Sequence, residues 1–213
     1  MARIVIDLQK EAMDGKTNLQ DLLRKALVVA RKLKLTDFEN WINKEMKGYS
    51  VDDEIPQYRV FTGQVEAWNP FHGWIAVTTN NGAYSIKHSA REPISSLINV
   101  YENSKENFAA VEITGAMAKC LNSNSSFPGP TNYQAKIPIN MLYSTIECIR
   151  NIVLDWALVL EENGIVGEGI EFSPEEKKAA QESPVINQYT VNFYGNVDNT
   201  QVQQNVKDSV QNQ

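Results

Sequence analysis

Few side chains in this sequence could do catalytic chemistry. His72 and His88 could act as general bases, and Cys120 and Cys148 could act as nucleophiles. His72 lies in an aromatic-rich stretch, residues 68–74, where a base or a stacking pocket is conceivable. No serine or cysteine has the surroundings of a nucleophile elbow, and the cysteines lack the CxxC spacing of zinc and redox sites. We predict no catalytic residue, and an aromatic loop that closes one end of a sheet.

An acidic turn, residues 52–54, is the one place where a metal ion could bind. Its carboxylates would suit magnesium or calcium. However, adjacent acids in a loop usually stay in water, and neither EF-hand spacing nor a second acid cluster accompanies these. The glycines form neither a GxGxxG pattern nor a Walker loop. We therefore predict no metal and no cofactor.

Arg150, Asn151 and Asp155 form a polar cluster within a predicted helix. A spacing of four residues places the Asn151 amide beside the Asp155 carboxylate. Buried polar groups must be paired. The cluster therefore predicts either a ligand pocket or, as is commoner, a structural network that ties Arg150 to a neighbouring acid.

A basic helix face could contact phosphate, but the charge of the chain argues against nucleic acid as a partner. Lysines and arginines number 20 and acids 26, which gives a net charge of -6. Sequence-independent nucleic-acid binders usually carry excess positive charge. The basic residues more simply form a solvated face opposite a leucine stripe. They are Arg24, Lys25, Arg31, Lys32 and Lys34.

Length and composition predict one globular domain with an appendage, or two small domains. The chain has 213 residues, of which 42% are hydrophobic and 22% are charged. No apolar run approaches the ~20 residues that span a bilayer, and the chain reaches Asp7 before the apolar region of a signal peptide could form. Two cysteines are too few for a disulfide scaffold. The sequence thus predicts a cytoplasmic protein without membrane contact.

The N-terminal quarter has the periodicity of helices. Apolar residues at helical spacing predict a short helix over residues 4–13. Capping boxes at Thr17 and Thr36 predict the starts of two amphipathic helices, of which the second ends at Gly48. Their short connection predicts an antiparallel helical hairpin.

The centre of the chain has the alternation of strands. Three short antiparallel strands are predicted at residues 58–65, 74–79 and 83–87. The other central elements are a helix over residues 93–103, a segment over 108–121 that begins as a strand and then favours helix, and a strand over 133–137.

The longest apolar pattern, residues 141–163, predicts a helix with a wide apolar arc at the centre of the core. Ser173, Pro174 and Glu176 then provide the N-cap, the first-turn proline and the capping glutamate of a last short helix. Residues 1–182 are therefore predicted to form one α+β domain, with an N-terminal helical hairpin, a small antiparallel β-sheet and a long buried helix.

Residues 183–213 form a tail of different composition, because charge almost vanishes and Asn and Gln dominate. The tail cannot build its own core. Residues 185–194 nevertheless alternate as a β-strand with one apolar face, which pairing with further copies or with a partner's edge strand would bury. The alternative is a disordered tail. The predicted interaction residues are Val185, Tyr189, Val191, Phe193, Val197 and Val202.

Three stretches carry a resemblance to a known family. They are residues 22–33 with Phe38, Trp41, Glu45, Gly48, Tyr49 and residues 56–59; residues 149–151, 154–158, 161–165 and 167–169 with Phe172 and Ser173; and residues 193–197 and 201–204. Together they resemble the AbiTii domain, a module of bacterial proteins linked to abortive infection. The GN-(x)n-QIQQG ending common in that family departs here at Asn205, where a glycine is usual. The resemblance implies a role in phage defence and supplies no catalytic motif.

Three hypotheses about function follow. The first is a non-enzymatic protein of antiviral defence that forms homo-oligomers, partly through its C-terminal strand. The second is an antitoxin-like regulator that binds a co-encoded toxic protein. The third is a nuclease or nucleotide-acting enzyme with an unrecognised site at the acidic turn or at His72.

Overall fold

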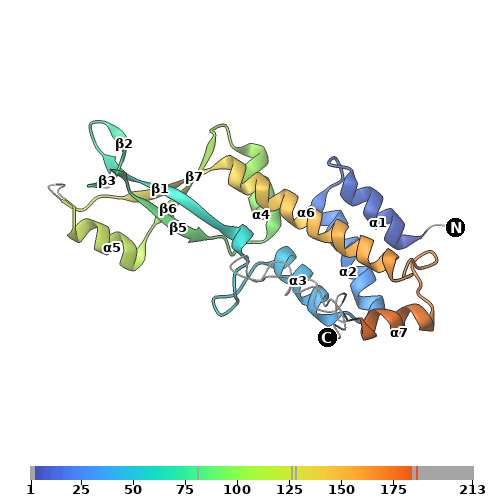
Figure 1. Ribbon diagram of the computed structural model, residues 1–213. Coiled ribbons are helices and arrows are strands. Elements are labelled where there is room, and N and C mark those ends of the chain that lie inside the picture. Colours follow the sequence, from blue (N-terminus) through green and yellow to red (C-terminus); the bar gives the residue numbers. More distant parts are fainter. Residues whose placement is uncertain (1–2, 81, 126, 128, 184–185, 187–213) are drawn as a thin grey trace, which may run out of the picture.

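The structure, a computed structural model, describes residues 3–80, 82–125, 127, 129–183 and 186. It has a helical part at one end and a β-sheet at the other, and one long helix runs from the sheet into the helical part (Figure 1). The predicted α+β fold, with its N-terminal helices, small antiparallel sheet and long buried helix, is confirmed. The predicted tail strand, residues 185–194, is wrong at Ile186, which is helical and fully buried in the helical core. The six predicted interaction residues, Val185, Tyr189, Val191, Phe193, Val197 and Val202, lie outside the described residues.

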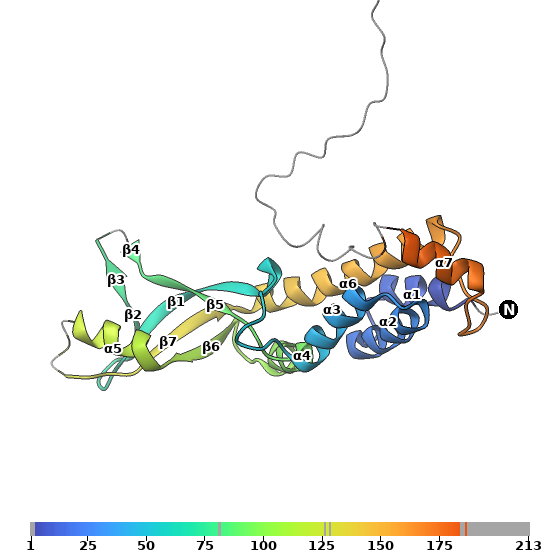
Figure 2. The same ribbon diagram turned by 90° about the horizontal axis from the view of Figure 1, so that it is seen from below.

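The helical part packs around the long helix α6 (Ile139–Glu162). Helices α1 (Ile4–Met13), α2 (Leu19–Leu33) and α3 (Thr36–Lys47) bury their apolar faces in a shared core with it. The short helix α7 (Pro174–Glu182) lies against α2, at the end of α6 far from the sheet (Figure 2). Trp156 of α6 is fully buried at the centre and stacks on Phe38 of α3, with ring centroids 3.9 Å apart.

The helix caps differ from two of the three predicted capping boxes. Asn18, rather than Thr17, caps α2, because its side chain accepts hydrogen bonds from the backbone N–H groups of Gln20 and Asp21. Lys34 takes a left-handed conformation directly after α2, and only Lys34 and Leu35 separate the two helices, so Thr36 is already helical. The capping box at the start of α7, between Ser173 and Glu176, is confirmed.

The sheet grows from one long strand, β1 (Val60–Asn69). Along one edge β1 pairs with β7 (Tyr133–Pro138), which in turn pairs with β6 (Phe108–Ile113). Along its other edge it pairs first with β5 (Ser85–Ser89) and then with β2 (Gly73–Ala76). All pairings are antiparallel, and β6 is the outermost strand on its side.

The strands lie where the sequence predicted them, but their ends differ from the prediction. Residues 57–59 form a 3-10 turn, η1 (Gln57–Arg59), and β1 continues to Asn69. The second and third predicted strands are each divided, at Val77 and at Tyr84, because the chain leaves β1 there to form a small hairpin of β3 (Thr78–Thr79) and β4 (Gly82–Ala83). Helices α4 (Ile94–Asn103) and α5 (Gly115–Ser123) flank β6, as the helix and the strand-to-helix segment had predicted.

Helices and side chains of the described residues cover one face of the sheet and leave the other uncovered. The covered face carries Phe61, Gly63, Val65 and Ala67 of β1, which pack against the helical core at one end and against a second apolar cluster under α5 at the other. The opposite face, called the open face below, is polar and aromatic. It consists of Thr62, Gln64, Glu66, Trp68, Trp74, Ala76, Ser85, Lys87, Phe108, Ala110, Glu112, Gln134 and Lys136.

Replacing Gly63 with alanine is expected to lower the free energy of unfolding by about 1–3 kcal/mol, because the covered face has no room for another methyl group. A Cβ atom on Gly63 would lie 3.0 Å from the Ala135 Cβ and 3.1 Å from the Ile137 Cγ1 atom of β7. Urea denaturation followed by circular dichroism measures the loss. The matched control is Gly15→Ala, where no atom lies within 4 Å of the new Cβ. Equal stability of the two variants would contradict the expected crowding.

Candidate functional site

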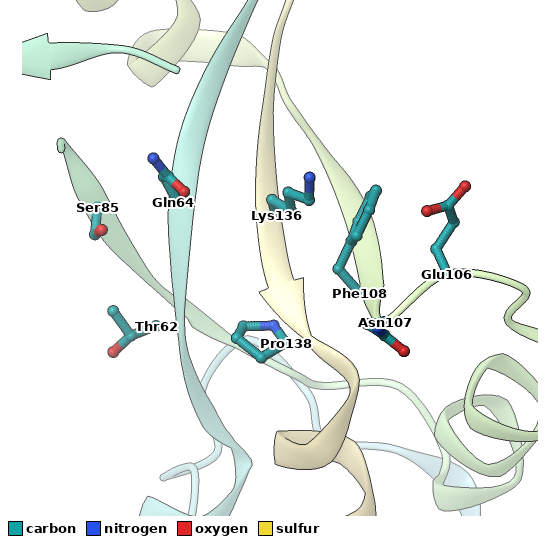
Figure 3. A pocket seen from close by; sticks show the side chains of 8 residues that line it. All are labelled: Thr62, Gln64, Ser85, Glu106, Asn107, Phe108, Lys136 and Pro138. Carbon is teal, nitrogen blue, oxygen red and sulfur yellow. The ribbon is translucent and has the colours of Figure 1, made fainter. Parts of the chain in front are cut away.

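The open face contains a shallow hollow with a volume of about 580 Å³. Figure 3 shows its lining, which Thr62 and Gln64 of β1, Ser85 of β5 and Lys136 of β7 contribute from the middle of the sheet. Glu106, Asn107, Phe108 and Pro138 complete it. Half of the eight lining residues are uncharged and polar, and their amides and hydroxyls both donate and accept hydrogen bonds.

Lys136, the basic side chain in the hollow, is already paired. Its Nζ lies 3.8 Å from the ring centroid of Phe108 and 3.6 Å from the Glu66 carboxylate. Glu66 also accepts a hydrogen bond from Gln134 Nε2 at 2.8 Å. Because the charge of Lys136 is balanced within the face, the hollow suits uncharged polar groups better than phosphate.

Aromatic side chains gather where β1 turns into β2. Trp68 and Trp74 face each other across the two strands, with ring centroids 5.4 Å apart in an edge-on arrangement. Phe71 at the tip is 90% exposed. Asn69 Oδ1 accepts hydrogen bonds from the Phe71 and His72 N–H groups and so fixes the turn. The predicted aromatic loop is therefore an exposed tip at the far end of the sheet.

A buried ion pair lies where the sheet joins the helices. Glu45 of α3 and Arg59 of η1 are both fully buried, and Arg59 Nη2 lies 2.5 Å from Glu45 Oε2. The hydroxyls of Tyr49 and Tyr58 donate to Glu45 Oε1 at 2.6 and 2.8 Å. Arg59 Nη1 donates to the carbonyls of Ala90 and Glu92, before α4. The carboxylate and the guanidinium are thus bonded to each other and to neighbouring groups inside the protein.

The pKa values of the groups in and near this network are shifted by burial and by the Glu45 carboxylate. Burial and the neighbouring Glu45 carboxylate raise the pKa values of Tyr49 and Tyr58 well above their usual range, so both remain neutral donors. Burial alone would lower the pKa of Arg59, but the Glu45 carboxylate holds it above its usual value. Burial, and to a smaller extent Glu45, also raises the pKa of the Cys148 thiol to about 11, which makes it a poor nucleophile near neutral pH.

The network fixes the sheet to the helical part. It joins α3, the start of β1 and the segment before α4, and Thr145 of α6 donates its hydroxyl to the Tyr58 carbonyl at 2.6 Å. None of its residues lines the hollow of the open face. We therefore assign it a structural role, which is to hold the open face in a constant position relative to the helices.

The basic residues of α2 form ion pairs with acids of the same chain. Arg24 pairs with Asp21, and Lys25 pairs with Glu11 of α1. Arg31 pairs with Glu39 at 2.7 Å, and Lys32 pairs with Glu171 at 2.6 Å. The fifth residue, Lys34, forms the left-handed end of α2. Because acids lie beside four of these five groups, the basic set does not form a positive patch.

The acidic turn is partly used by the fold. Asp53 accepts hydrogen bonds from the Ser50 N–H and hydroxyl and pairs with Lys44 at 2.7 Å. Lys44 and Ser50 lower the pKa of Asp53 to about 2. Asp52 and Glu54 are exposed. Among the described residues, no three histidine, cysteine or acidic side chains converge as metal ligands.

The histidines and cysteines are dispersed. His72 lies at the β1–β2 turn, whereas His88 pairs with Phe61 at the other end of β1. Cys120 is exposed on α5, and Cys148 is half-buried on α6. The structure therefore brings none of these four side chains to a shared site.

Arg150 belongs to a structural network, which was one of the two predicted alternatives; the other was a ligand pocket. It is buried on α6 and donates to the carbonyls of Asp14 and Thr17 in the α1–α2 loop, at 3.3 and 2.9 Å. Its acidic neighbour is Glu147, at 3.6 Å. Asn151 and Asp155 are exposed and do not join it.

The sequence had not singled out the Glu45–Arg59 pair or the open face as sites. A signal for the pair was present, because Glu45, Tyr49 and residues 56–59 all belong to the first stretch that resembles a known family. The structure brings these residues together. Among the described helices, none is both long enough and apolar enough to cross a bilayer.

Comparisons with known proteins gave one result. Neither the curated proteins nor the solved structures contain a match. The AbiTii family, whose name denotes abortive infection, matches residues 3–184, which include every helix and strand described above. The chain therefore belongs to the AbiTii family.

Proposed function

We propose that the protein acts in abortive infection, in the bacterial cytoplasm, as a binding protein that assembles with copies of itself. The observation that carries the proposal is a β-sheet that the described part of the chain leaves incomplete. The open face is uncovered and β6 has a strand on only one side within the described residues. Beyond the buried, helical Ile186, the sequence as far as residue 194 has the alternation that predicts a further strand. A chain with such a segment and an incomplete sheet can join to a second copy of itself by strand addition.

The hollow of the open face and the C-terminal tail have compatible chemistry. The hollow of the open face is lined by amide and hydroxyl groups, with Lys136 balanced by Glu66. The tail is rich in Asn and Gln and almost uncharged. Electrostatic repulsion would therefore not keep the tail away from the open face. The proposed assembly requires no catalytic centre.

Placing two acids on the apolar side of the tail pattern is expected to abolish assembly. By light scattering, the intact chain should exceed the 24.0 kDa of a monomer, and Val191→Asp/Phe193→Asp should return it to that mass. The reason is that buried carboxylates without partners strongly oppose association.

The control is Gln188→Asp/Asn192→Asp, which adds the same charge on the other side of the alternation and should keep the assembly. A tail deletion should end after Asn187, because Ile186 is fully buried in the helical core and its loss would confuse the result. An intact chain that is monomeric refutes self-assembly. If that monomer forms a tight complex with the product of the neighbouring gene, the protein is instead a regulator of a co-encoded partner.

A further inference from the structure

Strand β6 presents backbone groups that no strand of the described chain uses. The Ile139 N–H donates to the Asn107 carbonyl across the β6–β7 ladder at 3.0 Å. Because hydrogen-bonded pairs alternate along antiparallel strands, the peptide groups of Ala109, Val111 and Ile113 face β7, and those of Phe108, Ala110 and Glu112 face outward. The Phe108 carbonyl accepts from the Ser104 hydroxyl. The outward groups of Ala110 and Glu112 remain available for a further strand.

The side chains of β6 also fit an added strand. Ala109 and Val111 lie on the covered face but are only half-buried, whereas Ile113 is buried. Another strand with apolar residues on that side would complete their burial. Ala110 and Glu112 on the open face are exposed and leave that side free.

The opposite edge of the sheet is less suitable. By the same alternation, the outward peptide groups of β5 belong to Ser85, Lys87 and Ser89. Lysine on an edge strand is a common protection against strand addition. Strand β2 has only four residues. Strand β6, with six residues and no lysine, is therefore the better acceptor.

We infer that the outer edge of β6 receives residues 189–193 of a second copy as an added strand, an inference that rests on the proposed self-assembly. Tyr189, Val191 and Phe193 then extend the covered face beside Ala109 and Val111. The intervening Thr190 and Asn192 extend the open face beside its amides and hydroxyls. The alternation of the two strands is the same, so one register satisfies both faces.

The length of the chain requires that the strand comes from another copy. Ile186 is buried in the helical core, and only three residues take the chain from it to Tyr189, a reach of at most about 11 Å. Figures 1 and 2 place α7, which precedes Ile186, at the end of α6 far from β6. With 24 residues, α6 is about 36 Å long. The strand 189–193 therefore cannot lie along β6 of its own copy.

A complementation experiment tests this inference. Ala110→Pro blocks the acceptor, since its ring removes an outward N–H that the monomer does not use, and prolines are tolerated at such edge positions. Val191→Asp/Phe193→Asp blocks the donor. Each full-length variant alone should be monomeric by light scattering. Mixed together they should form a one-to-one complex, because each supplies what the other lacks. Ala110→Thr, which keeps the N–H, should assemble like the unchanged protein.

The outcomes separate this inference from the proposed function. If Val191→Asp/Phe193→Asp still assembles, tail-driven self-assembly is wrong. If that variant is monomeric while Ala110→Pro still assembles, the tail acts elsewhere and only the inference about β6 is overturned. Two monomers that remain separate on mixing also overturn it.

Hydrogen exchange gives a second readout that does not depend on the proline variant. In the intact assembled chain, the amides of Ala110 and Glu112 should exchange at least about tenfold more slowly than in Val191→Asp/Phe193→Asp. The amides of Ser85 and Lys87 on the opposite edge should not change. Equal exchange at Ala110 in both proteins would show that no strand covers this edge.

Discussion

Replacing Arg59 with methionine is expected to lower the free energy of unfolding by about 3–5 kcal/mol, because it leaves a buried charge without its partner. Arg59 and Glu45 are both fully buried. Without the guanidinium, the Glu45 carboxylate keeps only the two tyrosine hydroxyls as donors. The carbonyls of Ala90 and Glu92 lose their donor as well. Urea denaturation at neutral pH gives the difference.

The matched control is Arg24→Met, which removes an arginine from an exposed ion pair with Asp21. That variant should stay within about 0.5 kcal/mol of the unchanged protein, because exposed pairs contribute little. The double variant Glu45→Gln/Arg59→Met removes both charges and should cost less than the sum of the single variants. If Arg59→Met were no worse than Arg24→Met, the network could not be what fixes the sheet to the helices.

The helices were predictable because their information is local. The apolar arc of residues 141–163 predicted α6 to within two residues at either end. Ser173 and Glu176 predicted the start of α7, because a capping box involves only residues three apart. The same rule was wrong at Thr17 and Thr36. At Thr17 the next residue, Asn18, caps the helix instead, and at Thr36 the N-cap position belongs to Leu35, whose side chain makes no cap hydrogen bond.

The arrangement of the sheet and the buried pair was not predictable, because both depend on distant contacts. Alternation located β6 and β7 but could not tell that β6 would be outermost, since strand order is set by packing. Glu45 and Arg59 are residue types that usually remain in water. Their burial follows from the meeting of α3, η1 and the segment before α4, which no local pattern describes.

Replacing Trp156 with alanine is expected to lower the free energy of unfolding by about 3–5 kcal/mol, through the cavity left at the centre of the helical core. Trp156 is fully buried and stacks on Phe38 with an interplanar angle of 14°. Its loss would therefore remove a packing contact between α6 and α3, the helix that also holds Glu45. Thermal unfolding followed by circular dichroism measures the effect.

The control for this prediction is Trp156→Phe, which separates packing from hydrogen bonding. Among the described residues, the indole N–H of Trp156 has no hydrogen-bond partner, so phenylalanine removes an unsatisfied donor while it keeps a ring on Phe38. Its cost should stay below about 1.5 kcal/mol, because the smaller ring leaves only part of the cavity. A loss as large as that of Trp156→Ala would mean that the indole N–H has a polar partner in solution. The same core buries Ile186, from which the tail departs. Trp156→Ala could therefore weaken assembly as well as stability. The Val191→Asp/Phe193→Asp chain, by contrast, should remain as stable as the unchanged protein. Both results together would mean that the helical core holds the start of the tail in the position from which it reaches a second copy.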